Sequence, residues 1–343
     1  MDIKAAIKRL TERQDLDAEE MTLVMRELMS GNTTDAQIGA FLVALQMKGV
    51  KTEELLGGAT VMRELVTRVA LDDTHLVDTC GTGGSGSNKF NVSTAAAMVA
   101  ATAGARVAKH GNRGATSKSG SADVLEAAGV NLALTPEQVA QTIEAVGVGF
   151  MFAPAHHSAM KHVITARREI GVRTLFNMLG PLTNPAGAPN QVIGVFDGEW
   201  IPVLLETLAR LGSKHILIVA AEDGLDEISI SAATTVGELH DGKIFRYTVT
   251  PEELGVSRYD SYSMLQVDNV QESLAMMRNA LDYSNRPAGD IVALNAGAAL
   301  YAAGVCPDLK SGVVRSRQVL ESGEALTKLE QLVQFTGRFS SPG

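Results

Sequence analysis

One stretch of the chain joins a strand end, a glycine loop and a helix start: Asp78-Thr-Cys-Gly-Thr-Gly-Gly-Ser-Gly-Ser-Asn-Lys-Phe-Asn-Val-Ser-Thr94. Its glycines are Gly81, Gly83, Gly84 and Gly86, and a run of helix-forming residues follows over 95–103. Glycine lets backbone N–H groups approach a ligand closely, and a helix N-terminus adds unpaired N–H donors. The stretch therefore predicts an anion site, with phosphate as the expected ligand. The alternative is a tight turn between strand and helix that binds nothing.

The composition argues against several classes of protein. The chain has 343 residues, with 30 basic and 39 acidic side chains and a net charge of −9, which disfavours a sequence-independent nucleic-acid binder. Charged or polar residues interrupt every apolar run, so we expect no signal peptide and no membrane span. The two cysteines, Cys80 and Cys306, form no disulfide framework or zinc spacing, which indicates a cytoplasmic protein.

The pattern of apolar residues divides the chain. Residues 1 to about 70 contain short helices with one apolar face, which predicts a small bundle that also offers a dimer surface. From Leu76, short apolar runs alternate with helical segments, which indicates a mainly parallel sheet. We therefore expect an α/β protein with a small N-terminal helical domain, residues 1–72 joined by about 165–188, and a large α/β domain, residues 73–343.

Local signals predict the ends of several elements. Asp17 and Glu20 form a capping-box pattern before one helix, and Thr34 and Gln37 repeat it before the next. Residues 160–171 form a charged helical pattern, and the helix predicted for residues 174–179 stops before Pro181. Residues 241–242, Asp-Gly, lie between two apolar runs and predict a hairpin.

Further polar segments carry candidate chemistry. Residues 109–121, Lys-His-Gly-Asn-Arg-Gly-Ala-Thr-Ser-Lys-Ser-Gly-Ser, combine cations, hydroxyls and glycines, and predict a second phosphate cradle or, alternatively, a solvated basic loop. Residues 222–227, Glu-Asp-Gly-Leu-Asp-Glu, offer carboxylates for Mg²⁺ or form a solvated acidic turn. Arg167 or Arg168 could hold a carboxylate in a bidentate manner, although an exposed helix face explains the pair equally well. Loops at the carboxyl ends of parallel strands converge on one crevice.

Other residues are interpreted as structural. His156, His157 and His162 lack the second Cys or His group that a zinc site requires. Cys80 has no general base beside it in the sequence and is expected to be a small packed residue. The glycine loop lacks both the complete dinucleotide-binding pattern and the Lys-Ser/Thr pair that ends a P-loop.

Eight motifs in order resemble anthranilate phosphoribosyltransferases. They are Gly81-Thr-Gly-Gly84, Phe90-Asn-Val-Ser-Thr94, Lys109-His-Gly-Asn-Arg113, Ser117-Lys-Ser-Gly-Ser-Ala-Asp123, Phe150-Met-Phe-Ala-Pro154, Arg167-Arg-Glu169, Asn177-Met-Leu-Gly-Pro-Leu-Thr-Asn-Pro185 and Asp223-Gly-Leu-Asp-Glu227. The resemblance implies transfer of the phosphoribosyl group of phosphoribosyl pyrophosphate to anthranilate, in tryptophan biosynthesis. It also implies a nucleoside phosphorylase-type fold, a homodimer through the helical domain, and Mg²⁺.

The resemblance assigns roles to individual residues. It implies that phosphoribosyl pyrophosphate is bound by Gly81, Gly84, Ser85, Lys89, Asn91, Val92, Ser93, Thr94, Lys109, His110, Gly111, Asn112, Arg113, Gly114, Ala115, Thr116, Ser117 and Ser121. Anthranilate would contact Gly81, Asn112 and Arg167, with Arg167 on its carboxylate. Mg²⁺ would be held by Ser93, Asp226 and Glu227. No residue is assigned as a general base, because the amine of anthranilate already carries a lone pair.

The glycine loop departs from the family pattern. The family usually has Asp where this chain has Ser85, and Thr or a Ser-like residue where it has Lys89; small Ser- or Thr-rich residues usually stand at 114–115. A lost carboxylate and a gained cation make the loop more positive. We expect this to strengthen direct contact with pyrophosphate and to weaken reliance on the metal there.

Two other functions remain open at this stage. A nucleoside phosphorylase on the same fold would use phosphate and a pyrimidine nucleoside, but its own glycine and Lys/Ser signatures are not seen. A fold relative that binds nucleic acid without transferase activity is disfavoured by the charge of −9 and by the presence of Arg167, Asp226 and Glu227.

Overall fold

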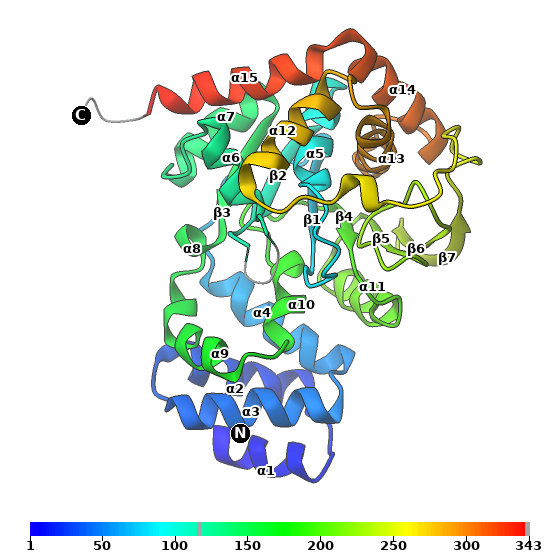
Figure 1. The fold of residues 1–343 in the computed structure, drawn as a ribbon. Coiled ribbons are helices and arrows are strands. Elements are labelled where there is room, and N and C mark those ends of the chain that lie inside the picture. The colour runs from blue at the N-terminus through cyan, green and yellow to red at the C-terminus, as the bar shows by residue number, and fades with distance from the viewer. Residues whose placement is uncertain (115–117, 340–343) are drawn as a thin grey trace.

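The structure is a computed structural model that describes residues 1–114 and 118–339. It has two lobes, a small helical one that contains the N-terminus and a larger α/β one above it (Figure 1). The chain starts with four helices, α1 (Ile3–Thr11), α2 (Ala18–Ser30), α3 (Asp35–Lys48) and α4 (Thr52–Leu65). The two predicted capping boxes are confirmed, at Asp17 with Glu20 and at Thr34 with Gln37.

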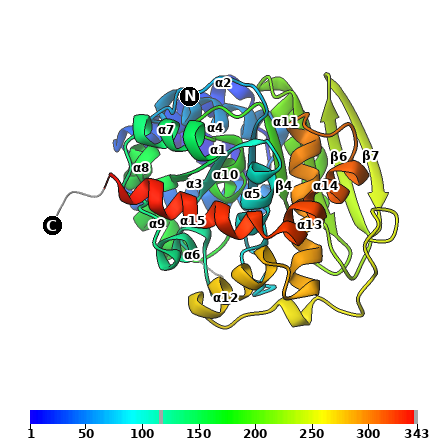
Figure 2. The same cartoon turned by 90° about the horizontal axis from the view of Figure 1, so that it is seen from above.

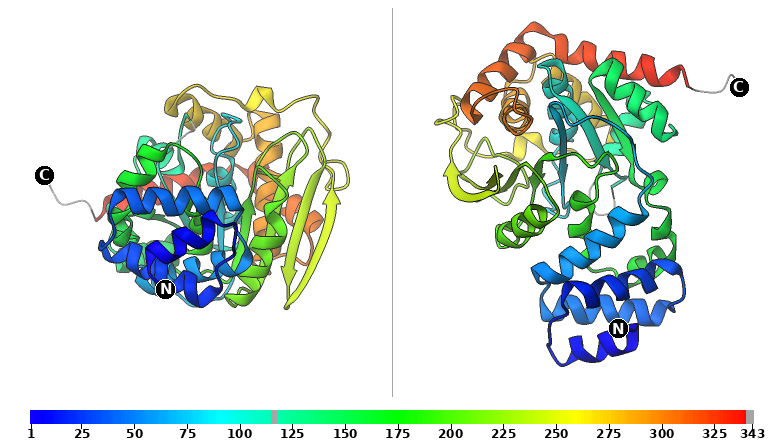
Figure 3. Two further views of the ribbon diagram at one scale, coloured as in Figure 1. Left: turned by 90° about the horizontal axis from the view of Figure 1, so that it is seen from below. Right: turned by 180° about the vertical axis from the view of Figure 1, so that it is seen from behind.

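A second segment, far along the chain, packs on these helices. It contains α8 (Ala153–His156), the 3₁₀ helix η1 (Ser158–His162), α9 (Ile164–Ile170) and α10 (Leu175–Leu182). Helix α9 packs on α3, and α10 packs on α3 and α4. Val163, Leu175 and Leu179 are buried in one apolar core with Phe41 and Leu55. Viewed from below, the helical lobe stands in front of the sheet (Figure 3, left).

The large lobe is built on a seven-stranded sheet with the order β3-β2-β1-β4-β5-β6-β7. Its strands are β1 (Leu76–Gly81), β2 (Arg106–Gly111), β3 (Val148–Phe152), β4 (Asn190–Gly194), β5 (His215–Ala221), β6 (Thr234–His240) and β7 (Lys243–Val249). The first five strands are parallel, and β6 and β7 form an antiparallel hairpin at one edge (Figure 2). The predicted fold class and the predicted hairpin are therefore confirmed.

Alternate residues of the strands enter two different cores, as the period of a strand dictates. Val192 and Leu217 contact the core beneath α5 (Val92–Thr102) and α13 (Arg286–Ala302). Ile193 and Ile216 face α11 (Trp200–Arg210) and join the core of the helical lobe. The two lobes therefore share one apolar core through the sheet.

The remaining helices cover the rest of the sheet and its end away from the helical lobe. They are α6 (Ser121–Ala128), α7 (Pro136–Val146), η2 (Ser263–Leu265), α12 (Val270–Leu281), α14 (Leu309–Ser322) and α15 (Glu324–Gly337). Helix α15 runs across the top of the large lobe (Figure 1). Within residues 1–114 and 118–339, each helix is too short or too polar to cross a lipid bilayer.

Two local predictions were wrong. The helix predicted for residues 160–171 is split into η1 and α9, because Val163 is buried and turns the chain toward the apolar core. Helix α10 continues past the predicted stop and includes Pro181, which lies in its last turn. There the ring removes only one late hydrogen bond, so a proline that would disrupt a helix interior is tolerated.

Candidate active site

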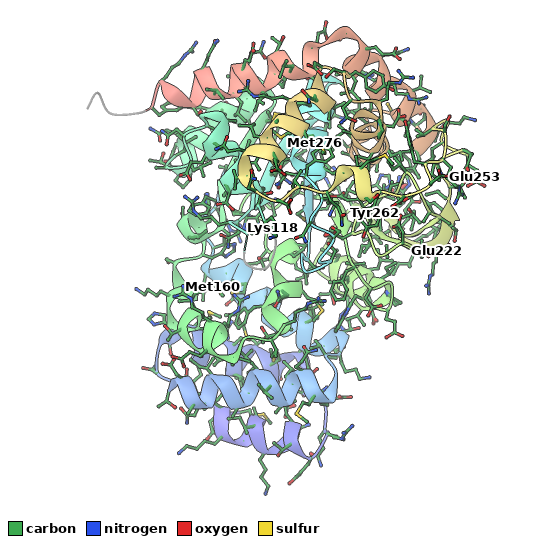
Figure 4. The ribbon with its side chains drawn as sticks, viewed as in Figure 1. Lys118, Met160, Glu222, Glu253, Tyr262 and Met276 are labelled. Atoms are coloured by element: carbon green, nitrogen blue, oxygen red, sulfur yellow. The ribbon has the colours of Figure 1, made fainter. Side chains whose placement is uncertain are left out.

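A cavity of about 630 Å³ lies at the carboxyl ends of the parallel strands, between the two lobes. The strand order turns back at β1, with β2 and β3 on one side and β4 and β5 on the other. Such a switch point is where open α/β sheets bind ligands. Met160, labelled on the helical lobe in Figure 4, is one of the residues that close the cavity from below.

The cavity brings together most of the predicted site residues. Those that line it are Gly81, Gly84, Ser85, Lys89, Asn91, Val92, Ser93, Lys109, His110, Gly111, Asn112, Arg113, Gly114, Ser121, Arg167, Asp226 and Glu227. Thr94 does not line it and is fully buried one position further into α5. Ala115, Thr116 and Ser117 lie outside the described residues.

The glycine loop connects β1 to α5, and three of its glycines have left-handed backbone conformations. Gly83, Gly84 and Gly86 have φ values of 67°, 84° and 67°, which only glycine adopts without strain. The loop then enters α5 at Val92, so the first turn of that helix faces the cavity. Unpaired N–H groups of such a first turn are suited to hold an anion.

Lys109 supplies a buried positive charge beneath the loop. Its side chain comes from β2, and Nζ donates to the carbonyl oxygen of Thr79 and, at 3.2 Å, to Ser93 Oγ. Burial lowers the pKa of Lys109, although the nearby Asp78 opposes this effect. The ammonium therefore fixes the two segments that flank the glycine loop.

His110 is a neutral side chain in the wall of the cavity. Burial lowers its pKa to about 3, with a smaller contribution from His157. Its Nε2 atom has no hydrogen-bond partner among residues 1–114 and 118–339. The backbone N–H of His110 donates to Asp78 Oδ1 at 3.1 Å, which anchors β2 to β1. A bound ligand could therefore donate a hydrogen bond to Nε2.

Arg113 lines the cavity, but its guanidinium is already paired with acidic side chains. Its guanidinium pairs with Asp123 at 3.1 Å and with Glu126 at 2.7 Å, both on α6. The backbone carbonyl oxygen of Asn112 accepts a hydrogen bond from the N–H of Ala122 at 3.2 Å, and its side-chain Oδ1 accepts one from the N–H of Arg113 at 2.8 Å. In this conformation, Arg113 positions the loop more than it contributes charge to the cavity.

The acidic pair after β5 is close to the glycine loop. Lys89 Nζ lies 2.5 Å from Asp226 Oδ1 and 3.8 Å from Glu227 Oε1. Burial raises the pKa of Asp226, but the charge of Lys89 and the hydrogen bonds from Lys89 and Ser85 together leave that pKa below its ordinary value. Burial raises the pKa of Glu227 to about 7, despite the opposing charge of Lys89. The cation gained in the loop is thus paired with a carboxylate, and is not a free donor as its sequence position suggested.

Gly194 allows the turn that carries Asp226 to lie close to the glycine loop. No local pattern in the sequence indicates this role of Gly194. A Cβ atom at Gly194 would overlap the carbonyl of Asp226, so any other residue would push the acidic turn away from β4. Gly194 also pairs with Gly81 in the parallel ladder between β1 and β4. Two glycines on neighbouring strands therefore bring the acidic turn and the glycine loop together.

Arg167 reaches the cavity from the helical lobe. Its guanidinium lies 4.9 Å from the centre of the Phe176 ring. Burial lowers its pKa, and among the described residues it has no ion pair with a carboxylate. A partly buried guanidinium without an anionic partner is suited to a ligand carboxylate. Arg168, the other member of the pair, is exposed and does not line the cavity.

Arg173 contacts the glycine loop and was missed in the sequence. Its Nη2 donates to the carbonyl oxygen of Gly84 at 2.6 Å, and its guanidinium lies 3.9 Å from the centre of the Phe196 ring. The arginine belongs to the connection between α9 and α10. The segment that packs on the helical lobe therefore also supports the loop.

Five of the seven histidines fall into two groups. His156 Nδ1 is 2.9 Å from the carbonyl of Thr67, and the rings of His110 and His157 are 5.1 Å apart. A separate cluster in the sheet contains His215, Glu238 and His240. The rings of His215 and His240 stack at 4.0 Å with only 5° between their planes, so their in-plane lone pairs do not converge on one ion.

Comparisons with known proteins agree with this architecture. Residues 73–326 match the family described as "Glycosyl transferase family, a/b domain", and residues 4–66 match "Glycosyl transferase family, helical bundle domain". An anthranilate phosphoribosyltransferase of Thioalkalivibrio sulfidiphilus is 58% identical over 336 residues, which cover 98% of this chain and 99% of that protein. One of Hahella chejuensis is 57% identical over 343 residues, covering 99% of each chain.

Solved structures give the same result. The crystal structure of an anthranilate phosphoribosyltransferase from Thermus thermophilus superimposes with a TM-score of 0.90 at 44% identity, covering 97% of this chain and 99% of that one. The Saccharomyces cerevisiae enzyme in complex with phosphoribosyl pyrophosphate and Mg gives a TM-score of 0.87 at 26% identity, with 98% of each chain covered.

Proposed function

The chain belongs to the anthranilate phosphoribosyltransferase family, and from that premise we propose which of its residues bind the substrates and how they promote the reaction. The enzyme transfers the phosphoribosyl group of phosphoribosyl pyrophosphate to the amine of anthranilate and releases pyrophosphate. The product, N-(5-phosphoribosyl)anthranilate, is an intermediate of tryptophan biosynthesis. The observation that carries the proposal is the convergence of the glycine loop, the acidic pair and Arg167 on one cavity.

The pyrophosphate group is held by the glycine loop and the start of α5. Backbone N–H groups of residues 83–86 and of the first turn after Asn91 supply donors, and Ser85 and Ser93 supply hydroxyls. Asn91 is itself held by Ser119, with Asn91 Nδ2 at 3.0 Å from Ser119 Oγ. That contact joins the first loop to residues 109–121, which complete the pocket for the sugar phosphate.

Anthranilate is held by Arg167 and Asn112. Its carboxylate accepts from the guanidinium of Arg167, which the structure leaves without an anionic partner within its described part. The side chain of Asn112 lies on the opposite, α/β wall of the same cavity. Holding anthranilate between the two lobes directs its amine toward the ribose, which raises the rate by positioning.

The donor set around Asp226 fits Mg²⁺. Two carboxylates, Asp226 and Glu227, lie in the wall of the cavity, and Ser93 adds a hydroxyl oxygen. Oxygen ligands of this kind, completed by phosphate oxygens, are what Mg²⁺ prefers. When bound, Mg²⁺ neutralises the charge that develops on departing pyrophosphate.

The protein contributes mainly electrostatics and alignment. Positive charge builds on the ribose ring as pyrophosphate leaves, as it does in glycoside cleavage. The amine of anthranilate attacks C1 from the opposite face with a lone pair that needs no prior deprotonation. The cavity is lined by residues of both lobes, which limits the access of water to the sugar.

We extend the proposal to the assembly and its setting. The helical lobe carries exposed apolar side chains at Leu23 and Met47, which are 48% and 73% exposed, and such residues support a homodimer through this lobe. Size-exclusion chromatography with light scattering tests this, and a Met47→Glu variant that stays dimeric would contradict it. The two free cysteines suit a cytoplasmic setting.

A fluorescence assay tests the proposed function. The protein is mixed with anthranilate, phosphoribosyl pyrophosphate and Mg²⁺, and the fluorescence of anthranilate should fall as it is consumed. Inorganic phosphate with a pyrimidine nucleoside should give no turnover. A folded protein that leaves anthranilate unchanged would contradict the proposal.

A further inference from the structure

The ammonium group of Lys89 contacts Asp226 and Glu227, the two carboxylates that we propose as ligands of Mg²⁺. Its Nζ atom lies 2.5 Å from Asp226 Oδ1 and 3.8 Å from Glu227 Oε1. All three side chains are only 11% exposed. An ammonium in hydrogen-bond contact with a carboxylate uses the same oxygen lone pairs that a metal ion needs.

The backbone around Lys89 is held on both sides, so the ammonium is directed to this place by the fold. Lys89 forms an antiparallel bridge with Gln266. The N–H of Phe90 donates to the carbonyl of Leu265 at 3.0 Å, and the N–H of Val267 donates to that of Asn88 at 2.8 Å. Tyr262, which is labelled in Figure 4, directly precedes η2, whose last residue is Leu265.

The positive charge of Lys89 affects how well Asp226 and Glu227 can bind a metal ion. Asp226 and Glu227 together can carry two negative charges, and Lys89 offsets one of them. Residue 85 is a serine in this chain, so the glycine loop has no carboxylate there whose negative charge would offset that of Lys89. A divalent ion that enters the pair must either displace the ammonium or lie beside a like charge in a poorly solvated site, and both reduce its affinity.

We propose that Lys89 is a tethered cation that competes with free Mg²⁺ for Asp226 and Glu227, so that the metal binds tightly only when it arrives with the sugar pyrophosphate. The inference rests on the proposed function, which places Mg²⁺ on these carboxylates. The pyrophosphate supplies the negative charge to which the ammonium moves, and this frees Asp226 for the metal. Lys89 thereby makes metal binding depend on substrate in this chain.

Binding of Mn²⁺ to the substrate-free protein tests the inference. Free Mn²⁺ is followed by electron paramagnetic resonance at constant ionic strength, so no catalytic turnover is involved. Lys89→Gln removes the charge and shortens the side chain by one bond, and it should bind Mn²⁺ at least about tenfold more tightly than the wild type. Lys89→Arg keeps the charge and should bind as weakly as the wild type.

Matched variants separate this effect from others. Lys214→Gln removes the same charge at a distant exposed pair, where Lys214 Nζ lies 2.9 Å from Asp73, and should leave Mn²⁺ affinity unchanged. Equal Mn²⁺ affinities for wild type and Lys89→Gln would overturn the inference while leaving the metal site intact, provided that Asp226→Asn lowers both. If Asp226→Asn has no effect in either background, the metal assignment itself fails, and the inference fails with it.

Discussion

Arg173 Nη2 donates a hydrogen bond to the carbonyl oxygen of Gly84, and the two atoms are 2.6 Å apart. This contact connects the segment packed on the helical lobe to the loop that faces the pyrophosphate. It is made by an exposed side chain, so its strength is limited by solvent. Its position, at the glycine with a φ of 84°, gives it influence over the shape of the loop.

Arg173→Ala should raise the KM for phosphoribosyl pyrophosphate about fivefold, which corresponds to about 1 kcal/mol, because the loop loses one support. The KM for anthranilate should change little. Arg168→Ala removes an exposed arginine that lies outside the cavity and serves as the control. Equal changes in the two KM values for Arg173→Ala would contradict the role of the contact.

Arg167→Ala should act on the other substrate. Loss of a charge-assisted hydrogen bond to the carboxylate costs about 2 kcal/mol, so the KM for anthranilate should rise roughly thirtyfold. The KM for the sugar donor should stay within about twofold of the wild type, because Arg167 lies on the helical side of the cavity. Steady-state kinetics with each substrate varied in turn separates the two, and an equal rise in both would remove Arg167 from its proposed role.

Gly194→Ala should disturb the acidic turn. The added Cβ would overlap the carbonyl of Asp226, so β4 or the turn must move, at a cost of about 1–3 kcal/mol in the free energy of unfolding. The affinity for Mn²⁺ should fall as well. At Gly198 the nearest atom to an added Cβ is 3.6 Å away, so Gly198→Ala is a matched control that should unfold at the wild-type denaturant concentration. A Gly194→Ala variant with unchanged stability would show that the turn is free to move.

The low pKa of His110 predicts a specific acid sensitivity. Burial lowers this pKa from 6.5 to about 3, so below pH 6.5 the unfolded chain takes up a proton that the folded protein does not. The contribution of neutral His110 to the free energy of unfolding is therefore complete above pH 6.5. It falls as the pH is lowered, by about 2 kcal/mol at pH 5. His110→Gln should reduce this loss in urea titrations at pH 7 and 5. His240→Gln, at a side chain that is 42% exposed, should keep it, and an unaltered pH dependence in His110→Gln would contradict the explanation.

The elements that the sequence predicts well are those with local causes. Asp17 and Thr34 cap helices through residues three positions away, and the glycines after β1 need positive φ wherever they occur. The contacts missed in the sequence join distant segments. Lys89 and Asp226 are 137 residues apart, and Arg173 and Gly84 are 89 apart. No pattern of propensity or spacing indicates which cation will meet which acceptor across the sheet.

Pro181 is a case in which a local sequence signal predicts the wrong end of a helix. Proline predicts the end of a helix, yet α10 includes it because the buried faces of Leu179 and Leu182 keep the last turn in place. Packing of the segment on α3 and α4 thus overrides the local preference. The same packing brings Arg167 to the cavity.

A crystal structure with phosphoribosyl pyrophosphate and Mg²⁺ soaked in would show directly whether the glycine loop and the acidic pair bind the sugar donor and the metal. We expect pyrophosphate on the backbone of residues 81–94, the metal on Asp226 and Glu227, and Lys89 turned from Asp226 toward the pyrophosphate. Pyrophosphate bound elsewhere, with the glycine loop empty and Lys89 still paired with Asp226, would contradict this expectation.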